Sequence, residues 1–94
     1  MVGSRNIMDK HINIKIYGHV WGVGFRFCAY EKMVELGLPG KAENVPEGVL
    51  VDTEGPEEKL EELVKWCHVG PSGARVSRVE VVEAAGPFVP LKMG

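Results

Sequence analysis

The chain has 94 residues, enough for one domain with a single core, and its 45% hydrophobic and 26% charged side chains are ordinary for a globular fold. A formal net charge of −2 gives no general attraction to nucleic acid or to an anionic membrane surface, and no apolar run approaches the roughly 20 residues that span a bilayer. The two cysteines, Cys28 and Cys67, are too few for a disulfide-rich secreted scaffold and lack zinc-site spacing. We therefore expect a cytoplasmic protein with reduced thiols and no nucleic-acid or membrane partner.

The N-terminal segment Met1–Lys10 is polar, without periodicity or the apolar core of a signal peptide. We expect this segment to be disordered and the domain to occupy residues 11–94. From His11 to Tyr17 apolar and polar residues alternate, with three isoleucines on one side. This alternation predicts a strand with one buried face. We expect His11 and His68 to lie at the surface.

The stretch Gly18–Gly24 is rich in glycine and precedes a helical pattern over Phe25–Leu36, which Gly37 is placed to end. Glycines allow successive backbone N–H groups to form an anion-binding nest beside the positive end of a helix. Arg26, near that helix start, offers a planar fork of donors to phosphate oxygens. The stretch predicts a small phosphate or carboxylate site, although a tight strand-to-helix turn explains the glycines equally well. It is neither a Walker loop nor a dinucleotide fingerprint.

The rest of the chain continues the alternation of strands and helices. The expected elements are a weak strand over Gly40–Val45, a turn over Pro46–Gly48, a strand over Val49–Glu54, a helix starting at Pro56, a strand over Ala74–Ala84 and a possible short fifth strand over Phe88–Met93. The alternation slips between Val76 and Val79, which indicates a β-bulge. The βαββαβ order with right-handed crossovers predicts an α+β, ferredoxin-like sandwich, in which two helices cover one face of an antiparallel sheet.

Two stretches resemble the signatures of the acylphosphatase family. Gly18–Arg26 reads Gly-His-Val-Trp-Gly-Val-Gly-Phe-Arg, which is similar to the family pattern Gly-x-Val-Gln-Gly-Val-x-Phe-Arg. Gly40–Gly48 resembles the second signature, with asparagine four residues after the first glycine and a second glycine four residues later. Gly70–Val76 also looks like the family's loop before its fourth strand, and the resemblance covers roughly His11–Val82. The family fold is the same ferredoxin-like sandwich.

The resemblance implies an enzyme that hydrolyses small-molecule acyl phosphates to carboxylate and inorganic phosphate, without a metal or other cofactor. Arg26 matches the family's phosphate-binding arginine, and Asn44 matches the asparagine that positions the attacking water. The loop whose backbone cradles the phosphate corresponds to His19, Val20, Trp21, Gly22, Val23, Gly24 and Phe25. Without the resemblance, Asn44 is more simply explained as a residue beside a turn that bonds to the local backbone.

Three departures from the family pattern keep an alternative open, namely a regulatory module that binds phosphate without turnover. Trp21 replaces a glutamine, Lys41 replaces an aromatic residue, and Glu43 adds negative charge beside Asn44. Strand alternation should nevertheless point Glu43 away from the side that carries Asn44. An RNA-binding module is excluded, because the charge is negative and no strand presents paired aromatic residues. No large apolar surface stripe indicates an obligate partner, so we expect a monomer.

Overall fold

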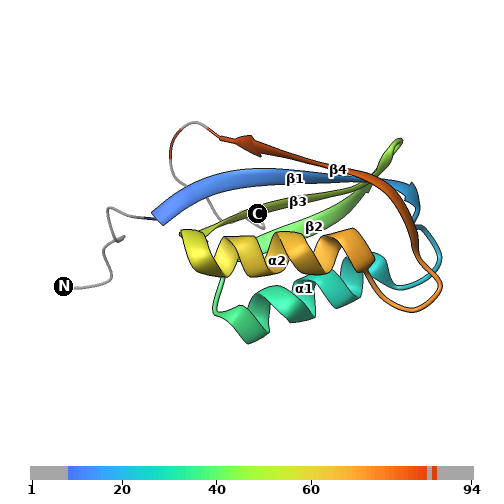
Figure 1. The fold of residues 1–94 in the computed structure, drawn as a ribbon, viewed down its shortest axis with the longest axis horizontal. Coiled ribbons are helices and arrows are strands. Elements are labelled where there is room, and N and C mark those ends of the chain that lie inside the picture. The colour runs from blue at the N-terminus through green and yellow to red at the C-terminus, as the bar shows by residue number, and fades with distance from the viewer. Residues whose placement is uncertain (1–8, 85, 87–94) are drawn as a thin grey trace, which may run out of the picture.

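The computed structural model describes residues 9–84 and 86, which form an antiparallel sheet with two helices packed on one face (Figure 1). The elements in chain order are β1 (Asp9–His19), α1 (Phe25–Leu36), β2 (Gly40–Val45), β3 (Gly48–Pro56), α2 (Glu57–Val69) and β4 (Arg75–Glu83). Across the sheet the strand order is β2-β3-β1-β4, and each neighbouring pair is antiparallel. The predicted ferredoxin-like sandwich is confirmed for this part of the chain.

The start of β1 differs from the prediction. The strand begins at Asp9, because Asp9 and Lys10 pair with the C-terminal end of β3. These two residues therefore belong to the sheet and not to a disordered segment. The remainder of the N-terminal segment, residues 1–8, and the possible fifth strand over Phe88–Met93 lie outside the described residues.

The end of β1 also lies further along the chain than predicted, because Gly18 and His19 still pair with β4. The register between β1 and β4 shifts at this point, and Ser77 becomes the extra residue on β4. The bulge predicted between Val76 and Val79 is therefore confirmed. The connection from β1 to α1 is consequently a short turn, closely tied to the sheet at its first residue.

The hydrophobic core lies between the helices and the sheet face that they cover (Figure 1). It consists of Ile12, Ile14, Ile16, Val20, Phe25, Ala29, Met33, Leu38, Val49, Val51, Leu60, Leu63 and Cys67. α1 contributes one row at four-residue spacing, as its sequence pattern predicts. Since Val20 and Phe25 both belong to the core, the connection between β1 and α1 is anchored at each end.

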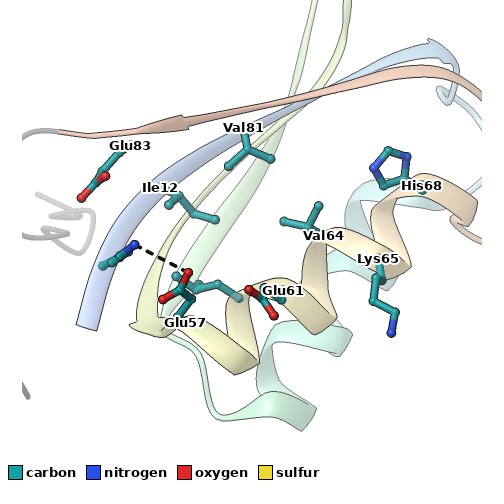
Figure 2. A pocket seen from close by; sticks show the side chains of 10 residues that line it. Ile12, Glu57, Glu61, Val64, Lys65, His68, Val81 and Glu83 are labelled. Atoms are coloured by element: carbon teal, nitrogen blue, oxygen red, sulfur yellow. Dashed lines mark ion pairs between the residues drawn. The ribbon is translucent and has the colours of Figure 1, made fainter. Parts of the chain in front are cut away.

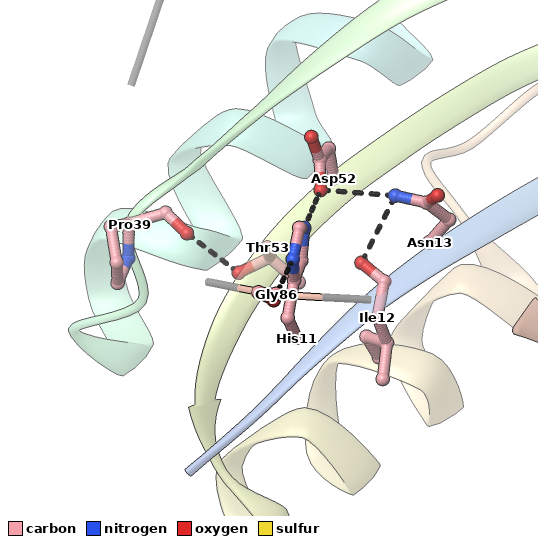
Figure 3. Close-up of polar contacts among 7 residues, drawn as sticks. All are labelled: His11, Ile12, Asn13, Pro39, Asp52, Thr53 and Gly86. Atoms are coloured by element: carbon pink, nitrogen blue, oxygen red, sulfur yellow. Dashed lines mark hydrogen bonds and ion pairs between the residues drawn. The ribbon is translucent and has the colours of Figure 1, made fainter. Parts of the chain in front are cut away.

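The sheet face opposite the helices, called the outer face here, carries polar side chains that include His11. The prediction that His11 lies at the surface is wrong, because its side chain is only 11% exposed. Its Nε2 lies 2.5 Å from Oδ1 of Asp52, and its Nδ1 donates to the carbonyl oxygen of Gly86 at 2.9 Å (Figure 3). Asn13 donates to the same Asp52 oxygen at 3.0 Å. Burial alone would lower the pKa of His11, but the bonds to Asp52 and Gly86 outweigh it and raise that pKa above 6.5.

A variant His11→Gln should therefore lose stability in a pH-dependent way. Below pH 6.5 His11 is protonated in both the folded and the unfolded chain, so its bond to Asp52 contributes fully, and the contribution disappears as the pH rises through the raised folded pKa. We expect a deficit of about 1 kcal/mol in unfolding free energy near pH 5.5 that shrinks toward pH 8. Urea unfolding across this range measures it. Asp52→Asn should show the same trend, and a deficit that grows with pH would contradict the assignment.

Candidate active site

The backbone between β1 and α1 adopts a conformation that depends on two glycines. Gly22 and Gly24 have φ angles of 75° and 76°, in the left-handed region that side-chain-bearing residues rarely adopt. Gly24 is the N-cap of α1 and provides no side-chain hydrogen bond to the helix. The first amides of a helix have no partners within the helix, so here they depend on solvent or on a ligand. This end of α1 is therefore suited to hold an anion.

The two helices carry opposite charges in their first turns. α2 begins with Glu57 and Glu58, which suit the positive end of the helix dipole. α1 has no acidic residue in its first turn and places Arg26 there instead. A cation at a helix N-terminus is unfavourable by about 0.3–1 kcal/mol unless an anion lies nearby. The arrangement at α1 thus favours binding of a negatively charged group over stability of the free helix.

Side chains that point inward hold the turn in place. Val20 and Phe25 are each only 1% exposed. The ring of Phe25 lies 5.2 Å from that of Trp66 in a tilted arrangement, and Val23 is partly buried against the core. The turn is therefore fixed by packing before any ligand binds, which is what electrostatic stabilisation of a reacting group requires.

Trp21 connects this turn to the hairpin between β2 and β3. Its indole Nε1 donates a hydrogen bond of 2.7 Å to the carbonyl oxygen of Gly48, although the side chain is half exposed. Gly48 pairs with Val45 at the end of the hairpin, and the neighbouring pair contains Asn44. The bond therefore ties the turn that precedes Arg26 to the start of β3, the strand that pairs with the Asn44-bearing strand β2. The sequence marks Trp21 as unusual but gives no signal for this long-range contact.

Removing the indole donor should loosen this connection. We expect Trp21→Phe to lower the unfolding free energy by about 1 kcal/mol, because the carbonyl of the buried Gly48 loses the hydrogen bond from the indole. Trp21→Gln retains an N–H donor and should recover part of that loss. Thermal unfolding of the three proteins measures both effects. Equal stability of the wild type and Trp21→Phe would show that the bond contributes nothing.

The sheet places Asn44 on the same side as Arg26. Arg26 and Ala42 line one groove between α1 and β2, and Asn44 follows Ala42 by two residues, so the two share a face of the strand. Asn44 is also paired with the core residue Val49. Glu43 alternates to the outer face, as predicted, and its charge is directed away from the site.

The remaining site candidates differ in their accessibility. His19 is the last residue of β1, where it pairs with β4 and is exposed. Trp21, Gly22 and Gly24 are exposed, whereas Val20 and Phe25 are buried and can offer only their backbone to a ligand. The candidates from His19 to Arg26 are consecutive in the chain and run from the end of β1 to the first turn of α1, whereas Asn44 lies on β2, two residues after the groove residue Ala42.

Metal-binding clusters and reactive thiols are the other features that could supply chemistry around this site. Within residues 9–84 and 86, no three His, Cys, Asp or Glu side chains gather closely enough to hold a metal ion. Both cysteines are free thiols, and burial raises the pKa of Cys67 to about 12, which keeps it protonated at neutral pH. Backbone amides, the guanidinium of Arg26 and the side-chain amide of Asn44 are groups here that can attract or hold an anion.

Comparison with known proteins identifies the family. The model of the acylphosphatase family matches residues 12–87. The chain belongs to the acylphosphatase family. It is 45% identical over 74 residues to an acylphosphatase of Caldanaerobacter subterraneus subsp. tengcongensis, covering 78% of this chain and 82% of that protein. It is 51% identical over 67 residues to one of Thermus thermophilus, covering 70% and 76%.

The fold agrees with a solved structure of the same family. An acylphosphatase from Coxiella burnetii matches with a TM-score of 0.84 at 28% identity, and the match covers 94% of both chains. The family suggested by the two sequence signatures is therefore confirmed. The activity of the chain is accordingly that of an acylphosphatase, the hydrolysis of acyl phosphates.

A larger cavity elsewhere does not suit an acylphosphatase substrate. A cavity of about 610 Å³ lies between α2 and the strands β1 and β4 (Figure 2). Its rim carries the carboxylates of Glu57, Glu61 and Glu83, with Lys10 paired to Glu57 at 3.7 Å. Lys65 and His68 line it too, so the carboxylates outnumber the lysines by one and the cavity offers an anionic acyl phosphate no net attraction. Size alone therefore does not identify the site, whereas the charge at the start of α1 favours the substrate.

Proposed function

We propose that the chain hydrolyses acyl phosphates by direct attack of water on phosphorus, with the phosphoryl group held by Arg26 and the backbone amides of His19–Phe25. The observation that carries this proposal is the start of α1, where left-handed glycines and an arginine replace the usual acidic residues. The phosphoryl oxygens would accept bonds from the amides and from the guanidinium fork. Transfer of a phosphoryl group needs positioning and charge stabilisation more than covalent help.

Asn44 is proposed to position the attacking water through its side-chain amide. Water forms the new bond to phosphorus while the bond between phosphorus and the bridging oxygen breaks, and the carboxylate leaves with that electron pair. The water proton passes to a phosphoryl oxygen, so the protein need not supply a base. The leaving carboxylate is stable, which removes the need for a strong general acid. The steps require no protein nucleophile and no metal.

The alternative of a phosphate-binding module without turnover rests on substitutions near the site. The register supports catalysis here, because it directs Glu43 to the outer face. Trp21 bonds to Gly48 through its indole, which gives this substituted side chain a structural role. The amides that would bind phosphate belong to the backbone, so a changed side chain need not remove them.

The partner of the site is proposed to be a free small molecule, and the chain is proposed to act as a monomer in the cytoplasm. Two free thiols suit a reducing compartment. No helix in the described part of the chain has the length and apolar character needed to cross a membrane.

Steady-state hydrolysis of acetyl phosphate in the presence of a chelator tests the proposal. We expect turnover that a chelator does not reduce and that inorganic phosphate inhibits competitively. Loss of activity on chelation, with recovery on adding a divalent cation, would overturn the metal-free mechanism. Phosphate binding without turnover above the uncatalysed rate would instead favour the binding module.

A further inference from the structure

A groove of about 320 Å³ runs between α1 and the edge strand β2, and it reaches the site at Arg26. We call it the α1–β2 groove, and its lining residues are Arg26, Phe27, Tyr30, Gly40, Lys41 and Ala42. Phe27 is 64% exposed and Tyr30 is 52% exposed. Two aromatic rings thus face solvent beside the residue proposed to bind phosphate.

These rings do not serve the core. The buried row of α1 is Phe25, Ala29 and Met33, and it leaves Phe27 and Tyr30 on other sides of the helix. Tyr30 lies one turn after Arg26, and residues at this spacing are neighbours on a helix surface. Both rings line the groove together with Arg26. Across from them, β2 presents small residues, Gly40 and Ala42, which leave room for a ligand.

The chemistry of an acyl phosphate requires a place for its acyl group near this point. One bridging oxygen joins the acyl carbon to phosphorus, so the acyl group lies within a few ångströms of the bound phosphoryl group. The α1–β2 groove touches Arg26, whereas the cavity at α2 and a further one at Cys28 and Trp66 are lined by none of the proposed site residues. Of these three cavities, the groove is the one that an acyl group could enter while the phosphate stays bound at Arg26.

We propose that the α1–β2 groove binds the acyl group of the substrate and selects acyl phosphates with an aromatic or extended apolar acyl group over acetyl phosphate. This inference rests on the proposed function. An apolar acyl group would bury the exposed faces of Phe27 and Tyr30, which gives a favourable contact that a methyl group is too small to make. Lys41 also lines the groove, beside the small residues Gly40 and Ala42 and across from the two rings.

Kinetics with two substrates test the proposal. Benzoyl phosphate and acetyl phosphate should be compared in the wild type, Phe27→Ala, Tyr30→Ala and the double variant. The wild type should have the higher kcat/KM for benzoyl phosphate. We expect each single variant to raise KM for benzoyl phosphate by about 5- to 30-fold with little change in kcat, as expected for a contact present equally in ground and transition states. The loss for acetyl phosphate should be at most about threefold, because its methyl group barely reaches the rings.

Val34→Ala is the matched control, since Val34 is a 60% exposed apolar residue on the same helix that does not line the groove. It should leave both substrates unaffected. The groove assignment would be overturned if Phe27→Ala and Tyr30→Ala lost equal activity toward both substrates, or lost none toward either. Turnover of acetyl phosphate would still support the proposed function in that case. Absence of turnover with both substrates would overturn the function and the groove together. A wild-type dimer that the double variant dissociates, measured by sedimentation, would assign the rings to an interface between copies instead.

Discussion

Arg26→Ala is expected to lower kcat/KM for acetyl phosphate by about 10³-fold and to abolish competitive inhibition by inorganic phosphate. The guanidinium is the cation in the first turn of α1, and in the proposed mechanism its charge would meet the phosphoryl group both before and during the reaction. Its removal should therefore raise KM and also lower kcat. Initial rates over a range of substrate concentrations, with and without phosphate, separate the two effects.

The same substitution should leave the free protein slightly more stable. Arg26 opposes the dipole of α1 when no anion is bound, so its removal is expected to raise the unfolding free energy by a few tenths of a kcal/mol. Arg78→Ala is a suitable control, because this guanidinium lies over the ring of Tyr17 on the outer face, 4.1 Å away. The kcat/KM of the Arg78→Ala protein for acetyl phosphate should stay within about twofold of the wild-type value. An Arg26→Ala protein that still bound phosphate normally would refute the assignment of this role.

The fold could be predicted because its elements are defined by local patterns. The isoleucine alternation of β1, the buried row of α1 and the glycine after Leu36 each depend on neighbours a few residues apart. The extra length of β1 could not be predicted this way. Asp9 and Lys10 have no periodicity of their own and become strand because β3 offers them a partner.

The sequence pointed to some residues of the candidate site but not to others, again because only local patterns can be read from it. Local chemistry pointed to the glycine turn and Arg26, but Asn44 resembled an ordinary residue beside a turn, and only the family signature gave it a role. The bonds from Trp21 to Gly48 and from His11 to Asp52 join residues 27 and 41 positions apart. Contacts of this range depend on how the strands are arranged, which a local pattern does not specify.

Local patterns also did not predict which apolar side chains of α1 remain exposed to solvent. The helical pattern of α1 identified the row that enters the core but said nothing of the other apolar side chains on that helix. Phe27 and Tyr30 became candidates for the site only when the fold placed them, still exposed, across from the edge of β2. One sequence signal could have identified Phe27 and Tyr30. Both are aromatic residues outside the core row of a helix that begins at a candidate anion-binding turn.

Asn44→Ala is expected to lower kcat by about 10²- to 10³-fold while inhibition by inorganic phosphate changes by less than about threefold. If Asn44 holds only the water, its loss removes an interaction that matters in the transition state and leaves ground-state binding of the phosphoryl group intact. This pattern would separate its role from that of Arg26, whose loss should impair both. Rates at saturating substrate and the inhibition constant of phosphate provide the two measurements.

Glu43→Gln is the matched control for Asn44→Ala, because Glu43 is the adjacent residue on β2 and its side chain is directed to the outer face. It should stay within about twofold of the wild type, since screening by solvent weakens its influence on the substrate. Asn44→Asp tests the amide itself, because a carboxylate cannot donate to the water or to the phosphoryl group and adds a repelling charge. It should be at least as impaired as Asn44→Ala. If Asn44→Ala instead raised KM and the phosphate inhibition constant together with kcat unchanged, Asn44 would be a phosphate ligand and the attacking water would need another partner.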